Sequence, residues 1–235
     1  MGGQESANYT VYPALDGGPA VVFVPGLGGR TKFVDQWNEA GQEPVIRRAT
    51  WSEPMSVPAV DERGAALAAL IDGSGAGEVV LVGHSMGGLV CLEAGRHLER
   101  RLRGVVVMCQ YPPHRTPLSP LAELPDRALA EEIEAPRHIA DTAALPEYAR
   151  LWRSEYHLLN RYLEADPRPV LQAPIIAVGA KDDASSWDAA CLEDWGRYTT
   201  EGATVHLVEG GHQMVEDLDP ATLREWINRL TRSAA

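Results

Sequence analysis

Ser85 lies in the motif Gly83-His84-Ser85-Met86-Gly87, between an apolar run and a helix-like run. The run Glu78–Val82 is short, rich in β-branched residues and bounded by Gly77, which is typical of a buried strand. Leu89–Ala94 is predicted to be helical. A serine on the sharp turn between a strand and a helix presents its hydroxyl at the edge of the sheet, and flanking glycines avoid a clash there. The motif predicts a nucleophilic serine.

A serine hydroxyl needs a base to take its proton, and His212 is the histidine best placed to do so. The chain has seven histidines, of which His84 belongs to the motif itself and His206 lies within a predicted strand. His212 follows the last predicted strand, on a loop that contains Gly210-Gly211. We expect the missing side chains of these glycines to let the imidazole reach Ser85.

The acid that orients this base is expected to follow a strand that lies between Ser85 and His212 in the chain. The strand predicted at Ile175–Gly179 leads into Ala180-Lys181-Asp182-Asp183. Asp182 fits a G-x-x-D spacing and is predicted to be the acid, with Asp183 as the alternative. An aspartate at either position would also serve to cap the following helix.

Two backbone amides are predicted to form the oxyanion hole, which binds the charge that develops on the substrate oxygen. The Met86 amide follows the nucleophile directly. The Leu27 amide belongs to the loop Pro25-Gly26-Leu27-Gly28-Gly29, and Gly26 is the second choice in that loop.

Strand-like and helix-like runs alternate along the chain, which favours a mostly parallel sheet covered by helices on both faces. Further strands are predicted at Ala20–Val24, Val45–Ala49, Gly104–Cys109 and Thr204–Val208. Further helices are predicted at Phe33–Glu39, Asp61–Ile71 and Ala221–Leu230. With the order serine, acid, histidine, this pattern predicts an α/β class protein with an α/β-hydrolase fold, in one domain over residues 1–235.

The segment 112–172 interrupts the alternation. It offers no good strand candidate, is rich in proline and contains predicted helices at Asp126–Glu134 and Glu147–Glu164. A helical insertion between two core strands is where a lid over a site would lie. The alternative is a helical excursion with no role at the site.

Composition and charge narrow the class of protein further. The net charge of −12 argues against nucleic acid or an anionic membrane as a partner. Cys91, Cys109 and Cys191 are odd in number and widely spaced, which fits neither a disulfide framework nor a zinc cluster. The first residues lack the features of a signal peptide, and no apolar run is long enough to span a membrane. We therefore expect a cytoplasmic location.

Several motifs in and after the insertion point to a family. They are Tyr111-Pro112-Pro113-His114-Arg115, Leu124-Pro125-Asp126-Arg127-Ala128-Leu129, Arg153-Ser154-Glu155-Tyr156 and Glu209-Gly210-Gly211-His212. In these motifs the chain resembles type II thioesterases, the stand-alone editing enzymes of polyketide and nonribosomal peptide assembly lines. The resemblance implies that Ser85, Asp182 and His212 form a triad. It also implies hydrolysis of acyl groups from the phosphopantetheine arm of an acyl or peptidyl carrier protein.

The chemistry expected of such a site is acyl transfer through an acyl-enzyme, for which no metal or organic cofactor is needed. A small-molecule carboxylesterase or lactonase would share the triad. A non-hydrolytic isomerase, cyclase or binding protein on the same fold is a further alternative. Four arginines, Arg96, Arg100, Arg101 and Arg103, either form a docking face for an acidic carrier or complement a helix dipole.

Overall fold

The computed structural model describes residues 4–5, 9–12, 20–28, 31–39, 43–51, 59–133, 142–165 and 168–232. Eight strands within these residues form one sheet, in the order β1-β2-β4-β3-β5-β6-β7-β8. β1 and β2 are antiparallel to their neighbours, and the other pairs are parallel. The predicted mostly parallel sheet is thus confirmed. The strands are β1 (Gln4–Glu5), β2 (Tyr9–Tyr12), β3 (Ala20–Val24), β4 (Ile46–Trp51), β5 (Val79–His84), β6 (Leu102–Met108), β7 (Ile175–Ala180) and β8 (Ala203–Val208).

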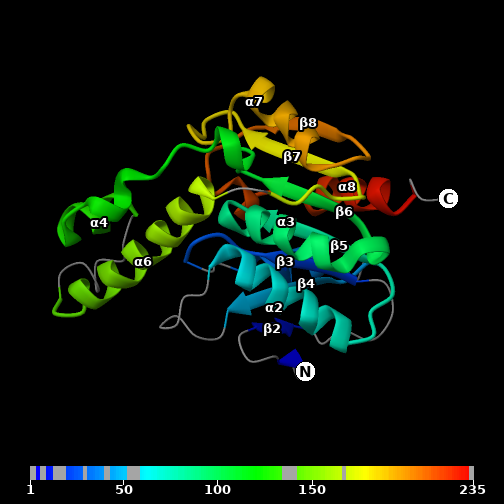
Figure 1. Cartoon of the computed structure of the whole chain (residues 1–235), viewed down its shortest axis with the longest axis horizontal. Coiled ribbons are helices and arrows are strands. Elements are labelled where there is room, and N and C mark those ends of the chain that lie inside the picture. The colour runs from blue at the N-terminus through cyan, green and yellow to red at the C-terminus, as the bar shows by residue number, and fades with distance from the viewer. Residues whose placement is uncertain are drawn as a thin grey trace.

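Helices cover both faces of the sheet, and α2 and α3 lie side by side across the front of it in Figure 1. The α-helices are α1 (Phe33–Asn38), α2 (Val60–Gly73), α3 (Met86–Leu98), α4 (Asp126–Glu132), α6 (Leu145–Glu164), α7 (Ala189–Glu193) and α8 (Pro220–Arg232). Short 3-10 helices are η1 (Glu99–Arg101), η2 (Pro113–Arg115), η3 (Pro120–Glu123), η4 (Asp194–Tyr198) and η5 (Met214–Glu216).

The alternation of side chains along the buried strands divides the core into two clusters. Val22 and Leu81 pack in the cluster on the α2 and α3 side, whereas Phe23 and Val82 pack in the cluster formed with α1 and α8. Successive residues of a strand point to opposite faces, so a strand that is buried on both sides is apolar throughout. This explains why β3 and the first four residues of β5 are continuous apolar runs.

The predicted strands and helices all appear, with ends that shift by a few residues. β7 continues to Ala180, one residue beyond the predicted end. The sequence did not indicate β1, β2 or α7, because these elements are short or polar. Glu134, the predicted last residue of one helix, lies outside the described residues.

The insertion between β6 and β7 contributes α4 and α6, which project beyond the carboxyl ends of the strands (Figure 1). Arg153 of α6 joins the two helices, because its Nη2 donates to the Leu124 carbonyl oxygen at 2.9 Å and to Asp126 Oδ1 at 2.8 Å. Residues 134–141 and 166–167 of the predicted insertion lie outside the described residues.

Two polar contacts fix α6 to the body of the protein. Arg63 of α2 donates from Nη2 to both carboxylate oxygens of Glu155, at 2.7 and 2.9 Å. One to two turns further on, the Tyr162 hydroxyl donates to Glu93 Oε1 of α3 at 2.7 Å. Arg63, Glu93 and Tyr162 are all buried, so these contacts are shielded from water and hold the second half of α6 in place. Among the described helices, none is both long and apolar enough to cross a membrane.

Candidate active site

Ser85 lies on the turn between β5 and α3, as the motif predicts. Its backbone has φ 53° and ψ −132°, in the left-handed region that non-glycine residues rarely adopt. The turn is held by the Ser85 amide, which donates to the Met108 carbonyl oxygen at 2.8 Å. A β-carbon at Gly87 would lie 2.6 Å from the Pro25 carbonyl oxygen, so the expected need for glycine at that position is confirmed. The strained turn leaves Ser85 partly exposed.

His212 lies on the loop after β8 and is paired with Asp183. Its Nδ1 lies 3.0 Å from Asp183 Oδ2. A carboxylate accepts, so Nδ1 carries the hydrogen and Nε2 is left as an acceptor. This tautomer is the one that a general base for a serine hydroxyl requires.

The aspartate that contacts His212 is Asp183, not Asp182, so the structure corrects the predicted choice. The G-x-x-D spacing was counted from Gly179, but β7 extends to Ala180 and the turn therefore begins one residue later. The Asp182 amide donates to the Gly210 carbonyl oxygen at 2.9 Å, while its side chain is exposed. The residue after it is the one that points inward, and Asp183 is buried.

Hydrogen bonds keep Asp183 ionised in its buried position. Burial alone would raise the pKa of this carboxyl, but the bonds from His212, Ser186 and Ser185 outweigh it and hold the pKa well below its ordinary value. The Ser186 hydroxyl donates to Oδ2 at 2.5 Å. The Ser185 hydroxyl and amide donate to Oδ1 at 2.7 and 3.0 Å. The charge is thus fixed beside His212 at neutral pH.

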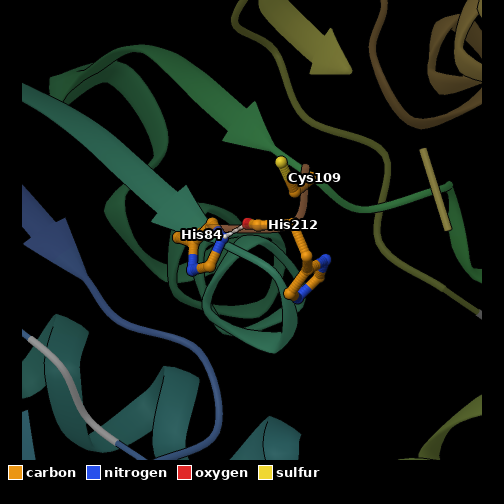
Figure 2. Close-up of side chains that lie close together, drawn as sticks. All are labelled: His84, Cys109 and His212. Carbon is orange, nitrogen blue, oxygen red and sulfur yellow. Dashed lines mark hydrogen bonds between the residues drawn. The ribbon is translucent and has the colours of Figure 1, made fainter. Parts of the chain in front are cut away.

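His84, which the sequence indicated only as part of the serine motif, supports the loop that carries His212. Its Nε2 lies 2.7 Å from the His212 carbonyl oxygen, as the dashed line in Figure 2 shows. A carbonyl only accepts, so Nε2 carries a hydrogen. Burial, and next to it the charge of His212, lower the pKa of His84 to about 4. His84 is therefore a neutral donor at pH 7.

Cys109 completes the cluster drawn in Figure 2, where donor atoms of His84, Cys109 and His212 lie within 4.8 Å of one another. Such a spacing suits a metal ion, but one ring nitrogen of each histidine is already hydrogen-bonded. His84 Nε2 and His212 Nδ1 hold the bonds described above. Burial raises the pKa of the Cys109 thiol to about 12, whereas a metal ligand must be a thiolate. We assign no metal role to the cluster.

The loop after β3 lies against Ser85, which is the position that the predicted oxyanion hole requires. A β-carbon at Gly26 would lie 2.8 Å from Ser85 Cβ and 3.4 Å from Ser85 Oγ. The Leu27 side chain packs on the core. Met86 is the first residue of α3, and the first amides of a helix have no acceptor within it. Gly29 of this loop lies outside the described residues.

The motif at the start of the insertion is tied to η4. His114 Nδ1 lies 2.9 Å from the Tyr198 hydroxyl, and the Arg115 Nε donates to Asp194 Oδ2 at 2.5 Å. Asp194 also pairs with Arg197, so this one carboxylate is shared between two arginines. The motif therefore fixes the path of the chain as it leaves β6.

The arginine cluster does not gather near the site. Arg101 pairs with Asp72, Arg103 pairs with Glu78, and Arg96 pairs with Glu93 at 3.3 Å. Arg101 and Arg103 flank the amino end of β6, whereas Ser85 lies at the carboxyl end of β5. The length of α3, about 20 Å for its helical rise, separates the two ends. These pairs weaken the docking interpretation of the cluster.

The alpha/beta hydrolase family matches residues 14–231 of the chain, and the chain belongs to this family. Among its relatives, thioesterase PikA5 of Streptomyces venezuelae is 28% identical over 151 residues, which are 60% of this chain and 53% of PikA5. The chain thus aligns with about half of the length of that relative.

Solved structures of thioesterases share the fold. RedJ, a thioesterase from the prodiginine biosynthetic pathway in Streptomyces coelicolor, is 25% identical with a TM-score of 0.71, over 91% of this chain and 85% of RedJ. YbtT, a type II thioesterase from the yersiniabactin biosynthetic pathway, has a TM-score of 0.76 at 16% identity, over 95% of this chain and 98% of YbtT. The predicted α/β-hydrolase fold is confirmed, and so is the resemblance in fold to type II thioesterases.

Proposed function

We propose that this protein is a serine thioesterase that releases acyl groups from the phosphopantetheine arm of a carrier protein, with Ser85, His212 and Asp183 as its triad. The observation that carries the proposal is the buried Asp183 paired with His212 Nδ1, at the same edge of the sheet as the strained Ser85 turn. The similarity to PikA5 and RedJ, both thioesterases, supports the thioester as the bond cleaved.

In the first half of the reaction, His212 Nε2 takes the proton of the Ser85 hydroxyl while Oγ attacks the thioester carbonyl carbon. The negative charge of Asp183 stabilises the imidazolium that forms. The amides of Leu27 and Met86 donate to the substrate oxygen as it gains charge. The carbon–sulfur bond then breaks, the acyl group stays on Oγ, and the phosphopantetheine thiol leaves with the proton from His212.

In the second half, water takes the place of the thiol. His212 removes a proton from the water as it attacks the acyl carbon, and returns that proton to Ser85 Oγ when the ester bond breaks. The products are the free acid and the original enzyme. Bonds and protons balance with water as the only co-reactant, so the residues named are sufficient for both steps of the reaction.

The test is mass spectrometry of an acyl carrier protein loaded with acetyl, propionyl or hexanoyl phosphopantetheine, incubated with wild type and with Ser85→Ala. We expect the free phosphopantetheine form to return with wild type and not with Ser85→Ala. The same acyl groups on N-acetylcysteamine measure how much the carrier adds.

The outcomes separate the alternatives. Faster hydrolysis on the carrier than on N-acetylcysteamine supports a carrier substrate, and equal rates contradict it. An untouched carrier together with serine-dependent cleavage of simple esters would replace the proposal with a carboxylesterase or lactonase. Activity retained by Ser85→Ala would contradict the triad.

A further inference from the structure

The elements that carry the site approach Ser85 from two sides. Asp183 follows β7 and His212 follows β8, whereas the loop with Gly26 and Leu27 follows β3. In the sheet, β5 lies between β3 on one side and β6, β7 and β8 on the other. The base that protonates the leaving group therefore lies on one side of Ser85, and the oxyanion loop lies on the other.

This arrangement assigns directions to the two parts of a thioester substrate. The leaving thiol must lie within reach of His212, because His212 supplies its proton. The acyl chain therefore lies on the other side of Ser85. That side is bounded by the loop after β3 and by the residue that covers this loop. The residue that covers it is Trp152 of α6.

Trp152 rests directly on this loop. A β-carbon at Gly28 would lie 2.9 Å from both Cη2 and Cζ2 of the Trp152 indole. Gly28 has φ +80°, so a glycine suits both its backbone and the close approach of the ring. Gly28 follows Gly26 by two residues, which span at most about 7 Å. Since Gly26 lies against Ser85, the indole covers the same loop that borders Ser85.

Trp152 is the middle member of an aromatic row on α6. Tyr148 lies one turn before it, with ring centroids 6.3 Å apart, and Tyr156 lies one turn after it, at 6.1 Å. Tyr156 is partly buried, and its burial, and next to it the charge of Glu132 of α4, raise the pKa of its hydroxyl to about 12. The row gives the insertion an apolar surface that begins at the oxyanion loop.

We infer that Trp152 is a specificity-determining residue, whose indole bounds the space for the acyl chain and limits the length of chain that reacts with Ser85. The inference rests on the proposed function of the same site. The contacts of Glu155 with Arg63 and of Tyr162 with Glu93 hold α6 against the body independently of Trp152. Removal of the indole therefore opens space beside the loop while α6 stays in place.

The test uses p-nitrophenyl alkylphosphonates with alkyl chains from methyl to decyl, because their alkyl chain takes the place of the acyl chain. Ser85 Oγ forms a bond to phosphorus, the bond from phosphorus to p-nitrophenolate breaks, and His212 accepts the serine proton. Intact-mass measurement of the labelled protein gives the rate for each chain length. The variants are Trp152→Ala and Trp152→Phe.

The matched control is Trp187→Ala, which removes an exposed tryptophan from the loop after β7, on the side of the base. We expect Trp152→Ala to raise the decyl-to-methyl rate ratio at least about tenfold, with Trp152→Phe between it and wild type, and Trp187→Ala to leave the ratio as in wild type. Circular dichroism checks that each variant is folded.

Labelling of Ser85 with a ratio that Trp152→Ala leaves unchanged would overturn the inference alone. A second outcome is a rate ratio that shifts in Trp152→Ala while the wild-type enzyme leaves the loaded carrier protein untouched. It would support the role of Trp152 in limiting chain length and overturn the proposed thioesterase activity on a carrier protein. If no chain length labels Ser85 in wild type, both the proposed function and the inference fail.

Discussion

The His84 side chain donates from Nε2 to the backbone carbonyl oxygen of His212 at 2.7 Å, so the residue before Ser85 holds the loop that carries His212. The two rings lie 5.1 Å apart between centroids. Because Ser85 follows His84 directly, one hydrogen bond couples the positions of the proposed nucleophile and the proposed base.

We expect His84→Ala to lower the free energy of unfolding by about 2 kcal/mol, since it leaves the His212 carbonyl oxygen without this donor. His84→Gln places an amide N–H near the position of Nε2 and should recover part of that loss. Urea unfolding measures both variants. If the two variants are equally destabilised, the effect is one of volume and not of the hydrogen bond.

The pKa of His84 also predicts how stability depends on pH. Its ordinary value is 6.5, and in the folded protein it is about 4. The unfolded chain therefore binds a proton that the folded protein excludes, and stability falls as the pH is lowered from 6.5 to 4, by up to about 3 kcal/mol. Above pH 6.5 this contribution is complete. Urea unfolding across this range should show a shallower slope in His84→Gln than in wild type.

Substitution of the two neighbouring aspartates separates their roles. Asp183→Asn removes the charge that orients His212 and should lower kcat by about three to four orders of magnitude. Asp182→Asn changes an exposed side chain and should alter kcat less than about twofold. Thioester hydrolysis by both variants, measured against wild type, gives the comparison. A larger loss in Asp182→Asn would contradict the assignment of the acid.

Gly26 is predicted to be intolerant of a side chain. A methyl group in Gly26→Ala would lie 2.8 Å from Ser85 Cβ and 3.0 Å from the His84 carbonyl oxygen, and would displace the nucleophile. We expect a loss of at least about tenfold in kcat/KM, since small misplacement of reacting groups is costly. Gly73→Ala is the control, because a β-carbon there meets no atom within 4 Å. Similar losses in both variants would count against the crowding argument.

The ion pair between Arg63 and Glu155, which holds α6 against α2, leads to a further prediction. Glu155→Gln leaves the Arg63 guanidinium without this carboxylate, and both side chains are largely buried, with 15% and 8% exposure. We expect a destabilisation of about 2–3 kcal/mol. The double variant Arg63→Met, Glu155→Leu should lose less stability than the sum of the losses in the single variants Arg63→Met and Glu155→Leu. A double-mutant cycle in urea unfolding measures this difference. Additive losses would show that the pair is not coupled.

Local patterns in the sequence predicted the positions of most site segments. The turn at Ser85 and the loop of His212 follow from short motifs beside strong apolar runs, and both appear where expected. The aspartate that contacts His212 lies one residue after the predicted one, because the end of β7 depends on its pairing with β8 and not on its own residues. The positions of β1 and β2 were not predictable either, since polar or four-residue strands carry little periodic signal.

Contacts between distant segments could not be predicted from the sequence. The bond from His84 to the His212 loop joins residues 128 positions apart. The contact of the Trp152 indole with Gly28 depends on how an inserted helix packs, and the spacing of residues within that helix does not reveal it. Both contacts come from tertiary packing, which is why the sequence indicated neither.

The residues proposed to break the bond and the residue proposed to select the acyl chain come from different stretches of the polypeptide. Ser85 precedes the insertion between β6 and β7, Asp183 and His212 follow it, and Trp152 lies within it. Mutation and selection can therefore change the cleavage of the bond and the choice of acyl chain separately. Descendants of such a protein can exchange or remodel the insertion, and so acquire new substrates, while the reactive groups pass on unaltered.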